Sequence, residues 1–357
     1  MRVLYFGTYE RDYPRNAQVI SCLRGAGVDV VERHASVWER RRHKWSLGVG
    51  AALRVAGAET RLIVGGRREQ FDAVIVGYPG HFDMPVARRL AGRRPLVFNP
   101  LVSLHDTLVG DRGRFASRSP GAGVLWHVDR LAFTRADLVI ADTEQHARYF
   151  RETYDLPPER VEVCLVGAED RLFRPGWQPS QQFRVLFVGK LIPLHGLETI
   201  LEAARLAPEL PFRIVGSGQL DGLLAEPPPN VEWVRWVEYE HLPEELQSAG
   251  CALGIFGTSE KAARVIPNKA FQAIACGTPL VTADTPAARE LLTDGESALL
   301  VPPADPAALA AAVRRLAADP ELAARVGSGG LAAYRERASE EVLGARWRAA
   351  LERLVEA

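Results

Sequence analysis

The sequence predicts an α/β protein of two doubly wound domains, each a parallel sheet with helices on both faces. Three observations support this. Short apolar runs alternate with amphipathic stretches along the chain, as in repeated strand–helix units. Those runs are apolar almost throughout, which is typical of strands buried on both faces. The length of 357 residues is that of about two domains.

Composition and charge narrow the class of protein. Apolar residues make up 47% of the chain and charged residues 25%, enough apolar surface for a folded core. The 44 basic residues equal the 44 acidic ones, which argues against a general nucleic-acid binder. The opening MRVLYFG indicates a buried strand, not a signal peptide, and no apolar run approaches the roughly 20 residues of a membrane span.

The cysteines also carry information about the compartment. They are scattered, with no CxxC spacing, at Cys22, Cys164, Cys251 and Cys276. This argues against a metal cluster or a disulfide framework and fits a reducing environment. We therefore expect a soluble, cytoplasmic protein.

The first half of the chain supplies the first predicted sheet. Its expected strands are 2–7, 29–34, 72–77, 95–100, 137–142 and 161–167, and its expected helices are 15–26, 82–91, 124–135 and 144–153. The polar stretch 171–182 has two prolines, a glycine and no period, which is typical of a linker. We therefore place the first domain at 1–172.

The second half restarts the same rhythm. Its expected strands are 183–189, 212–218, 231–237, 251–257, 279–284 and 297–302. Helices are expected at 196–206, 241–249, about 268–276, 287–292, 305–317 and 320–336. This gives a second domain at 183–336. An amphipathic helix in the remaining 337–357 is expected to pack back towards the first domain.

Two segments of the second half resemble a known family. VLFVGKLIPLHGLETILEAA spans 185–204, and the segment 264–303 contains IPNKAFQAIACGTPLV. They resemble motifs of the retaining family 4 glycosyltransferases (group 1), which have the GT-B fold of two facing Rossmann-like domains. The stretch VEVCLVGAEDRLFRP, 161–175, also resembles the family. The resemblance is strong from about 136 to 336 and weaker before 120.

The match departs from the family at charged positions. Lys190 stands where the family has its pyrophosphate-binding Arg, and His195 stands where it has a Lys. The paired glutamates are both missing, since Arg264 and Gln272 occupy their positions. Gln272 retains the ability to hydrogen-bond ribose hydroxyls as a neutral partner.

The resemblance implies that a hexose moves from a nucleoside-diphosphate sugar to a hydroxyl acceptor, such as a lipid-linked or cell-surface saccharide in polysaccharide biosynthesis. Cations and helix N-terminal amides would stabilise the diphosphate leaving group. The donor-binding residues that we predict are Gly7, Thr8, Lys190, His195, Gly216, Asn268, Lys269, Gln272 and Glu290. The simpler alternative is surface lysines, a helix-end histidine and ordinary turns.

His105 and Asp106 are the predicted catalytic residues. They follow an expected strand, where the family often has a His that meets the transferred sugar. Asp106 would orient that ring or polarise the acceptor hydroxyl, and a purely structural His105 is the alternative. The chain has no Asp-x-Asp motif before the donor loops, so we expect neither a metal nor a cofactor. Front-face retention requires no protein nucleophile, and none is evident.

The stretch 33–45 is locally basic and carries two tryptophans. A solvated surface is the simpler interpretation. The other is a patch for anionic lipid headgroups that would hold the protein on the inner face of a membrane. The residues predicted to form it are Arg40, Arg41, Arg42 and Lys44.

Two other functions stay open at this point. One is a non-catalytic saccharide- or partner-binding protein, which the missing glutamates favour. The other is a nucleotide-sugar epimerase of the same fold, which would release free sugar without an acceptor.

Overall fold

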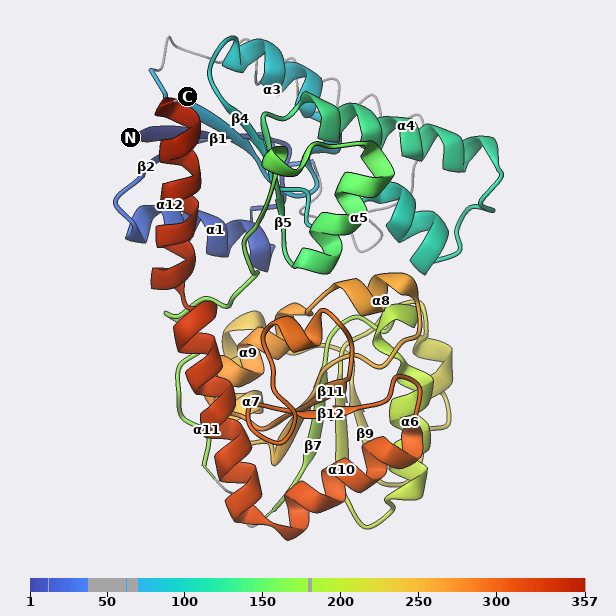
Figure 1. Ribbon diagram of the computed structural model, residues 1–357. Helices are drawn as coiled ribbons and strands as arrows, with labels where there is room; N and C mark the ends of the chain where they lie inside the picture. The colour runs from blue at the N-terminus through green and yellow to red at the C-terminus, as the bar shows by residue number, and fades with distance from the viewer. Residues whose placement is uncertain (12, 38–61, 63–69, 179–181, 357) are drawn as a thin grey trace. The chain divides into compact units, whose positions relative to one another are not determined.

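The chain divides into two units, Met1–Leu165 together with Glu340–Ala357, and Val166–Ser339. The structure is a computed structural model that describes residues 1–11, 13–37, 62, 70–178 and 182–356 (Figure 1). Within these residues each unit holds one six-stranded sheet. The prediction of an α/β protein with two doubly wound, Rossmann-like domains is therefore confirmed.

The sheet of the first unit is parallel, with the strand order β2-β1-β3-β4-β5-β6. Its strands are β1 Arg2–Gly7, β2 Asp29–His34, β3 Ala73–Val76, β4 Leu96–Phe98, β5 Leu138–Ala141 and β6 Val161–Val163. Most side chains of β1, β3, β4 and β5 are buried, which explains why these segments show no apolar–polar alternation.

Helices pack on both faces of this sheet (Figure 1). They are α1 Pro14–Gly25, α3 Met84–Ala91, α4 Pro120–Arg135, α5 Glu144–Tyr154 and α12 Glu340–Glu356. α4 starts four residues before the predicted 124, because Ser119 accepts the Ala122 N–H at 3.2 Å and Pro120 suits the first turn. α12 packs on α1, where a methyl group on Gly344 would lie 2.5 Å from the Cys22 carbonyl oxygen.

The second unit repeats the design with the strand order β12-β11-β10-β7-β8-β9, again parallel. Its strands are β7 Val185–Val188, β8 Phe212–Val215, β9 Val231–Val234, β10 Cys251–Leu253, β11 Leu280–Ala283 and β12 Leu299–Val301. Its helices are α6 Leu197–Leu206, α7 Leu242–Gln247, α8 Glu260–Arg264, α9 Asn268–Cys276, α10 Pro306–Ala318 and α11 Pro320–Arg337. The helix expected at 287–292 is only a 3₁₀ turn, η7 Ala288–Glu290.

The segment after β6 packs against the second unit before the predicted linker begins. Tyr334 of α11 donates its hydroxyl to the Ala168 carbonyl at 3.1 Å and to Asp170 at 2.6 Å. Further along, the backbone N–H of Trp177 donates to the Cys276 carbonyl at 3.2 Å. These contacts place residues 166–172 in the second unit, although the sequence assigns them to the first.

None of the helices that the structure describes is long and apolar enough to cross a bilayer.

Candidate functional site

A glycine directly follows each of three neighbouring strands of the second sheet. Gly254 follows β10, Gly189 follows β7 and Gly216 follows β8. Gly189 and Gly216 have φ values of +148° and +136°, a region that side chains disfavour. A methyl group on Gly216 would collide with the Gly189 carbonyl. The backbone is thus closely packed at the carboxyl edge of the sheet, where doubly wound folds bind ligands.

Lys269, in the first turn of α9, extends to this edge. The side chain is buried, and its Nζ lies 3.7 Å from the centroid of the Phe187 ring of β7. Among the residues that the structure describes, that nitrogen has no hydrogen-bond partner. A methyl group on Gly189 would lie 2.7 Å from it. Burial lowers the pKa of Lys269 well below its ordinary value, because removal from water disfavours the charged amine.

His195 also lies beside Gly189. Its ring packs edge-on to Phe187 with centroids 5.7 Å apart, and a methyl group on Gly189 would lie 3.4 Å from its Cε1. His195 Nδ1 donates to the Lys190 carbonyl, which can only accept. Lys190 itself has an exposed side chain.

The structure therefore brings two predicted cations, His195 and Lys269, to Gly189, and the third, Lys190, follows Gly189 in the chain. Gly216 joins them, because its neighbour Val215 accepts the Gly189 N–H at 2.9 Å. Asn268 begins α9.

Gln272 lies one turn beyond Lys269 on α9, and residues three apart share a helix face. It is buried, and its Nε2 donates to the Tyr239 hydroxyl at 3.4 Å. Glu290 ends η7, which follows β11, two strands away from β7 in the sheet order. Arg264 ends α8 and donates to Glu260 at 3.2 Å.

Sequence reasoning missed the partners of Gln272. Tyr239 begins the 3₁₀ turn η6 Tyr239–His241 after β9, and Phe173 packs edge-on against its ring at 5.6 Å. The charge of Glu169 also acts on Tyr239, whose pKa it helps to raise. Glu169 comes from a stretch that the sequence singled out only for its resemblance to the family, and nothing in the sequence connects it to position 272.

In the first unit, Gly7 is the last residue of β1 and Thr8 follows it. Gly7 has φ +125°, and a methyl group on it would lie 2.9 Å from Asp83 Cγ. Asp83 accepts the Thr8 N–H at 2.8 Å and the Thr8 hydroxyl at 3.1 Å. Both side chains are buried, so in this structure the Thr8 hydroxyl anchors its own loop.

His105 and Asp106 lie where β4 is followed by a π-helical turn, η2 Asp106–Asp111. His105 is half-buried and Asp106 is buried. Asp129 of α4 lies nearby, and its side chain is fully buried. Asp129 organises the turn by accepting from Ser103 Oγ at 2.7 Å, the Leu104 N–H at 3.0 Å, the His105 N–H at 2.8 Å and the Tyr154 hydroxyl at 3.0 Å.

The predicted basic patch, Arg40, Arg41, Arg42 and Lys44, lies outside the described residues.

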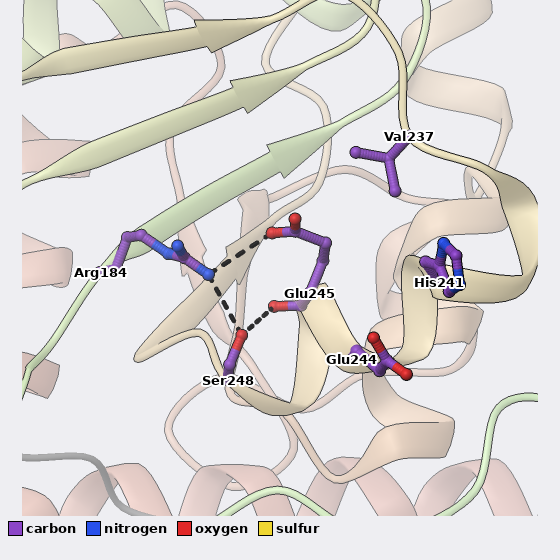
Figure 2. A pocket seen from close by; sticks show the side chains of 6 residues that line it. All are labelled: Arg184, Val237, His241, Glu244, Glu245 and Ser248. Carbon is purple, nitrogen blue, oxygen red and sulfur yellow. Dashed lines mark hydrogen bonds and ion pairs between the residues drawn. The ribbon is translucent and has the colours of Figure 1, made fainter.

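A shallow pocket of about 430 Å³ lies elsewhere in the second unit (Figure 2). Its lining residues are Arg184, Val237, His241, Glu244, Glu245 and Ser248. Arg184 reaches Glu245 at 3.4 Å and Ser248 at 3.1 Å, and Arg213 binds the same Glu245 at 2.7 Å. Because these charges compensate one another and no predicted site residue lines the pocket, we assign it no ligand.

Comparison with known proteins shows which family models the two halves of the chain match. Residues 2–167 match the family model "Glycosyl transferase 4-like domain", and residues 182–319 match "Glycosyl transferases group 1". The chain is 26% identical to a D-inositol 3-phosphate glycosyltransferase of Thermomonospora curvata, over 85% of this chain and 81% of that protein. It is 30% identical to the protein of that name in Acidothermus cellulolyticus, over 60% of this chain and 52% of that protein.

Solved structures share the fold. Sucrose-phosphate synthase of Thermosynechococcus elongatus matches with a TM-score of 0.75 and 18% identity over 99% of each chain. Alr3699/HepE of Anabaena, in complex with UDP-glucose, matches with a TM-score of 0.72 and 18% identity, over 99% of this chain and 100% of that one. Both sheets, the motifs of the second unit and the two family models thus agree: the chain belongs to the group 1, family 4 glycosyltransferases and is a glycosyltransferase of the GT-B fold.

Proposed function

We propose that this enzyme moves a hexose from a nucleoside-diphosphate sugar to a hydroxyl acceptor with retention of configuration. The names of the relatives suggest an inositol phosphate as one acceptor. The UDP-glucose complex of the structural neighbour HepE suggests the class of donor. A lipid-linked saccharide is the other acceptor class, as the family resemblance implies.

The buried amine of Lys269 is the observation that supports the donor site best. An amine with no anionic partner costs folding free energy, and it gains most when an anion arrives. It lies beside Gly189, where the absence of a side chain lets a ligand approach the backbone closely. His195 and Lys190 add donors at the same point, and α9 contributes the amides of its first turn.

In the proposed reaction, the bond between the anomeric carbon and the diphosphate oxygen breaks while the acceptor oxygen bonds to the same face of that carbon. The acceptor proton passes to the departing phosphate oxygen, so no protein nucleophile takes part. We assign His105 to the transferred sugar. Asp106 is buried, which suits orientation of His105 better than contact with the acceptor.

We propose that the cations at Gly189 replace a divalent metal. Lys190, His195 and Lys269 would balance the charge that develops on the leaving diphosphate. Transfer that continues in the presence of EDTA supports this assignment, and loss of transfer that Mg²⁺ or Mn²⁺ restores would contradict it.

Thermal unfolding with UDP, GDP and ADP tests the donor site, because a ligand of the folded state raises Tm. Product analysis with the matching nucleotide hexose then tests the reaction, with inositol phosphate and a lipid-linked saccharide as separate acceptors. A product with the anomeric configuration of the donor supports retention. Stabilisation without transfer would indicate a binding protein, free sugar without an acceptor would indicate an epimerase, and no stabilisation would refute the site.

We also propose peripheral attachment to an anionic membrane. Besides the stretch 33–45, the segment 112–135 supports it: this segment has five arginines, and its one acid, Asp129, is fully buried. On α4, Val124 is 61% and Leu131 is 44% exposed. Each cation near an anionic surface contributes about 1 kcal/mol.

Co-sedimentation with anionic and neutral vesicles tests the attachment. We expect salt-sensitive binding to anionic vesicles only. Charge reversal at Arg40–Arg42 and, separately, at Arg114, Arg118 and Arg130 should each weaken it. Protein that stays in the supernatant with anionic vesicles at low salt would refute attachment and favour a soluble acceptor.

A further inference from the structure

Three segments that are distant in the sequence meet at Gln272. Gln272 comes from α9, Tyr239 from the turn after β9, and Glu169 from the segment that follows β6. Gln272 and Glu169 are 6% and 5% exposed, so both polar groups need partners. Arg171 donates to Glu169 through two contacts, at 2.7 and 3.0 Å, so that carboxylate has a cationic partner.

The phenol of Tyr239 lies between these two groups, and it has a single proton. The charge of Glu169 helps to raise the pKa of Tyr239, and since a carboxylate can only accept, the phenol is the donor in this pair. The pKa of Tyr239 is raised by burial first and by the Glu169 charge second, so the proton stays on the phenol. The phenol oxygen is then left as an acceptor, and Gln272 must present its NH₂ group, as the 3.4 Å contact from Nε2 shows.

This arrangement determines which way round the amide of Gln272 is held. With Nε2 committed to Tyr239, the carbonyl Oε1 is the atom that the amide offers to a ligand hydroxyl. Gln272 shares the helix face of Lys269, three residues earlier, which faces Gly189.

We propose that Glu169 and Tyr239 are positioning residues that hold Gln272 as a fixed acceptor for a ribose hydroxyl of the donor. This inference rests on the nucleotide site of the proposed function. The carboxylate missing at 272 is replaced by a carboxylate at 169 that acts through a phenol. The pair thereby sets a preference for ribonucleotides over 2′-deoxyribonucleotides.

The proposed series of contacts from Glu169 through Tyr239 to Gln272, here called the relay, predicts the effect of a negative charge at position 272. In Gln272→Glu, two carboxylates would compete for the one phenol proton. The carboxylate that does not accept it would face a lone pair of the phenol oxygen. We therefore expect Gln272→Glu to bind nucleotide more weakly, although it restores the family's residue. In the double variant Glu169→Gln/Gln272→Glu, the phenol donates to residue 272 and accepts from the amide at 169, so binding returns.

The test measures Kd by calorimetry for whichever of UDP, GDP and ADP stabilises the wild type, and for its 2′-deoxy counterpart. We expect the wild type to prefer the ribonucleotide by about tenfold. Tyr239→Phe should bring the two affinities together. Tyr334→Phe is the matched control: it removes another phenol that bonds residues 168 and 170, and the preference should survive in it.

The outcomes separate this inference from the proposed function. Loss of the preference in Tyr239→Phe only, with recovery in the double variant, supports the relay. A preference that persists in Tyr239→Phe, or a Gln272→Glu variant that binds as the wild type does, overturns the relay and leaves the nucleotide site intact. Equal loss in Tyr334→Phe would reduce Tyr239 to a structural role. A wild type that binds no nucleoside diphosphate overturns both proposals.

Discussion

Replacing Lys269 by Met should separate the stability of the second unit from its affinity for nucleotide. Met has a similar length and fits the apolar surface of Phe187, whereas the amine is buried with no hydrogen-bond partner among the described residues. We expect the free variant to be at least as stable as the wild type. Its affinity for a nucleoside diphosphate should fall, because a hydrogen bond to a charged group contributes about 1.5–3 kcal/mol. That loss corresponds to roughly a tenfold to 150-fold rise in Kd.

The lowered pKa of Lys269 adds a second signature. The unfolded chain binds this proton more tightly than the folded one, so the free energy of unfolding should rise with pH between the lowered pKa and the ordinary value of 10.5. A bound diphosphate reverses the effect by favouring the ammonium form. Nucleotide binding in that window should therefore take up a proton, and Lys269→Met should take up correspondingly less.

Calorimetry in two buffers of different ionisation enthalpy measures that proton, and denaturation across the same pH range measures the stability slope. Arg205→Met is the matched control. It removes a cation from α6 of the same unit, where Arg205 makes an exposed 3.0 Å pair with Glu202 that contributes little to stability. Unchanged affinity and proton uptake in Lys269→Met would refute the assignment of Lys269 to the diphosphate.

Three further predictions concern other parts of the chain. Gly189→Ala should abolish nucleotide-induced stabilisation, since the new methyl group would lie 2.7 Å from Lys269 Nζ at φ +148°; Gly222→Ala, which meets nothing within 4 Å, should keep it. Asp129→Ala should lower the free energy of unfolding in urea by more than about 3 kcal/mol, because several buried donors lose their acceptor, and a smaller loss would contradict that role. The four buried cysteines should resist iodoacetamide at about pH 8 until the protein unfolds, since burial raises the pKa of Cys164 to about 11; rapid alkylation of the native protein would contradict this.

The fold was predictable because a strand that is covered on both faces has an almost entirely apolar sequence. Runs such as VLYF in β1 and VLFV in β7 stay apolar at successive positions only where both faces of a strand are covered. The boundaries were less predictable where local contacts decide them. Ser119 and Pro120 start α4 four residues before the predicted position. Tyr334 hydrogen-bonds Asp170, 164 residues earlier in the chain, and so holds that segment in the second unit.

The candidate site was predictable in part for a similar reason. Lys190 and His195 follow one strand within six residues, and Lys269 and Gln272 share one helix turn, so short motifs contain them. Burial was not predictable, since the same sequence fits an exposed Lys269 as well as an amine packed on Phe187. The burial of Asp129 was not predictable either, because its neighbours His127 and Arg130 are exposed and a helix of 16 residues shows several faces.

The substitution at position 272 shows why motif comparison needs the structure beside it. In the sequence alone, Gln272 in place of the family's Glu means that a carboxylate is missing, and this favours a protein without catalytic activity. In the folded unit Glu169 lies near Tyr239, and Tyr239 contacts Gln272. A carboxylate is therefore present near position 272, although it does not come from α9. Arg264, which occupies the other missing position, pairs with Glu260 at 3.2 Å. In the arrangement that we propose, the carboxylate missing at 272 is supplied from a segment over 100 residues earlier, so its loss weighs less against catalysis than the sequence suggests.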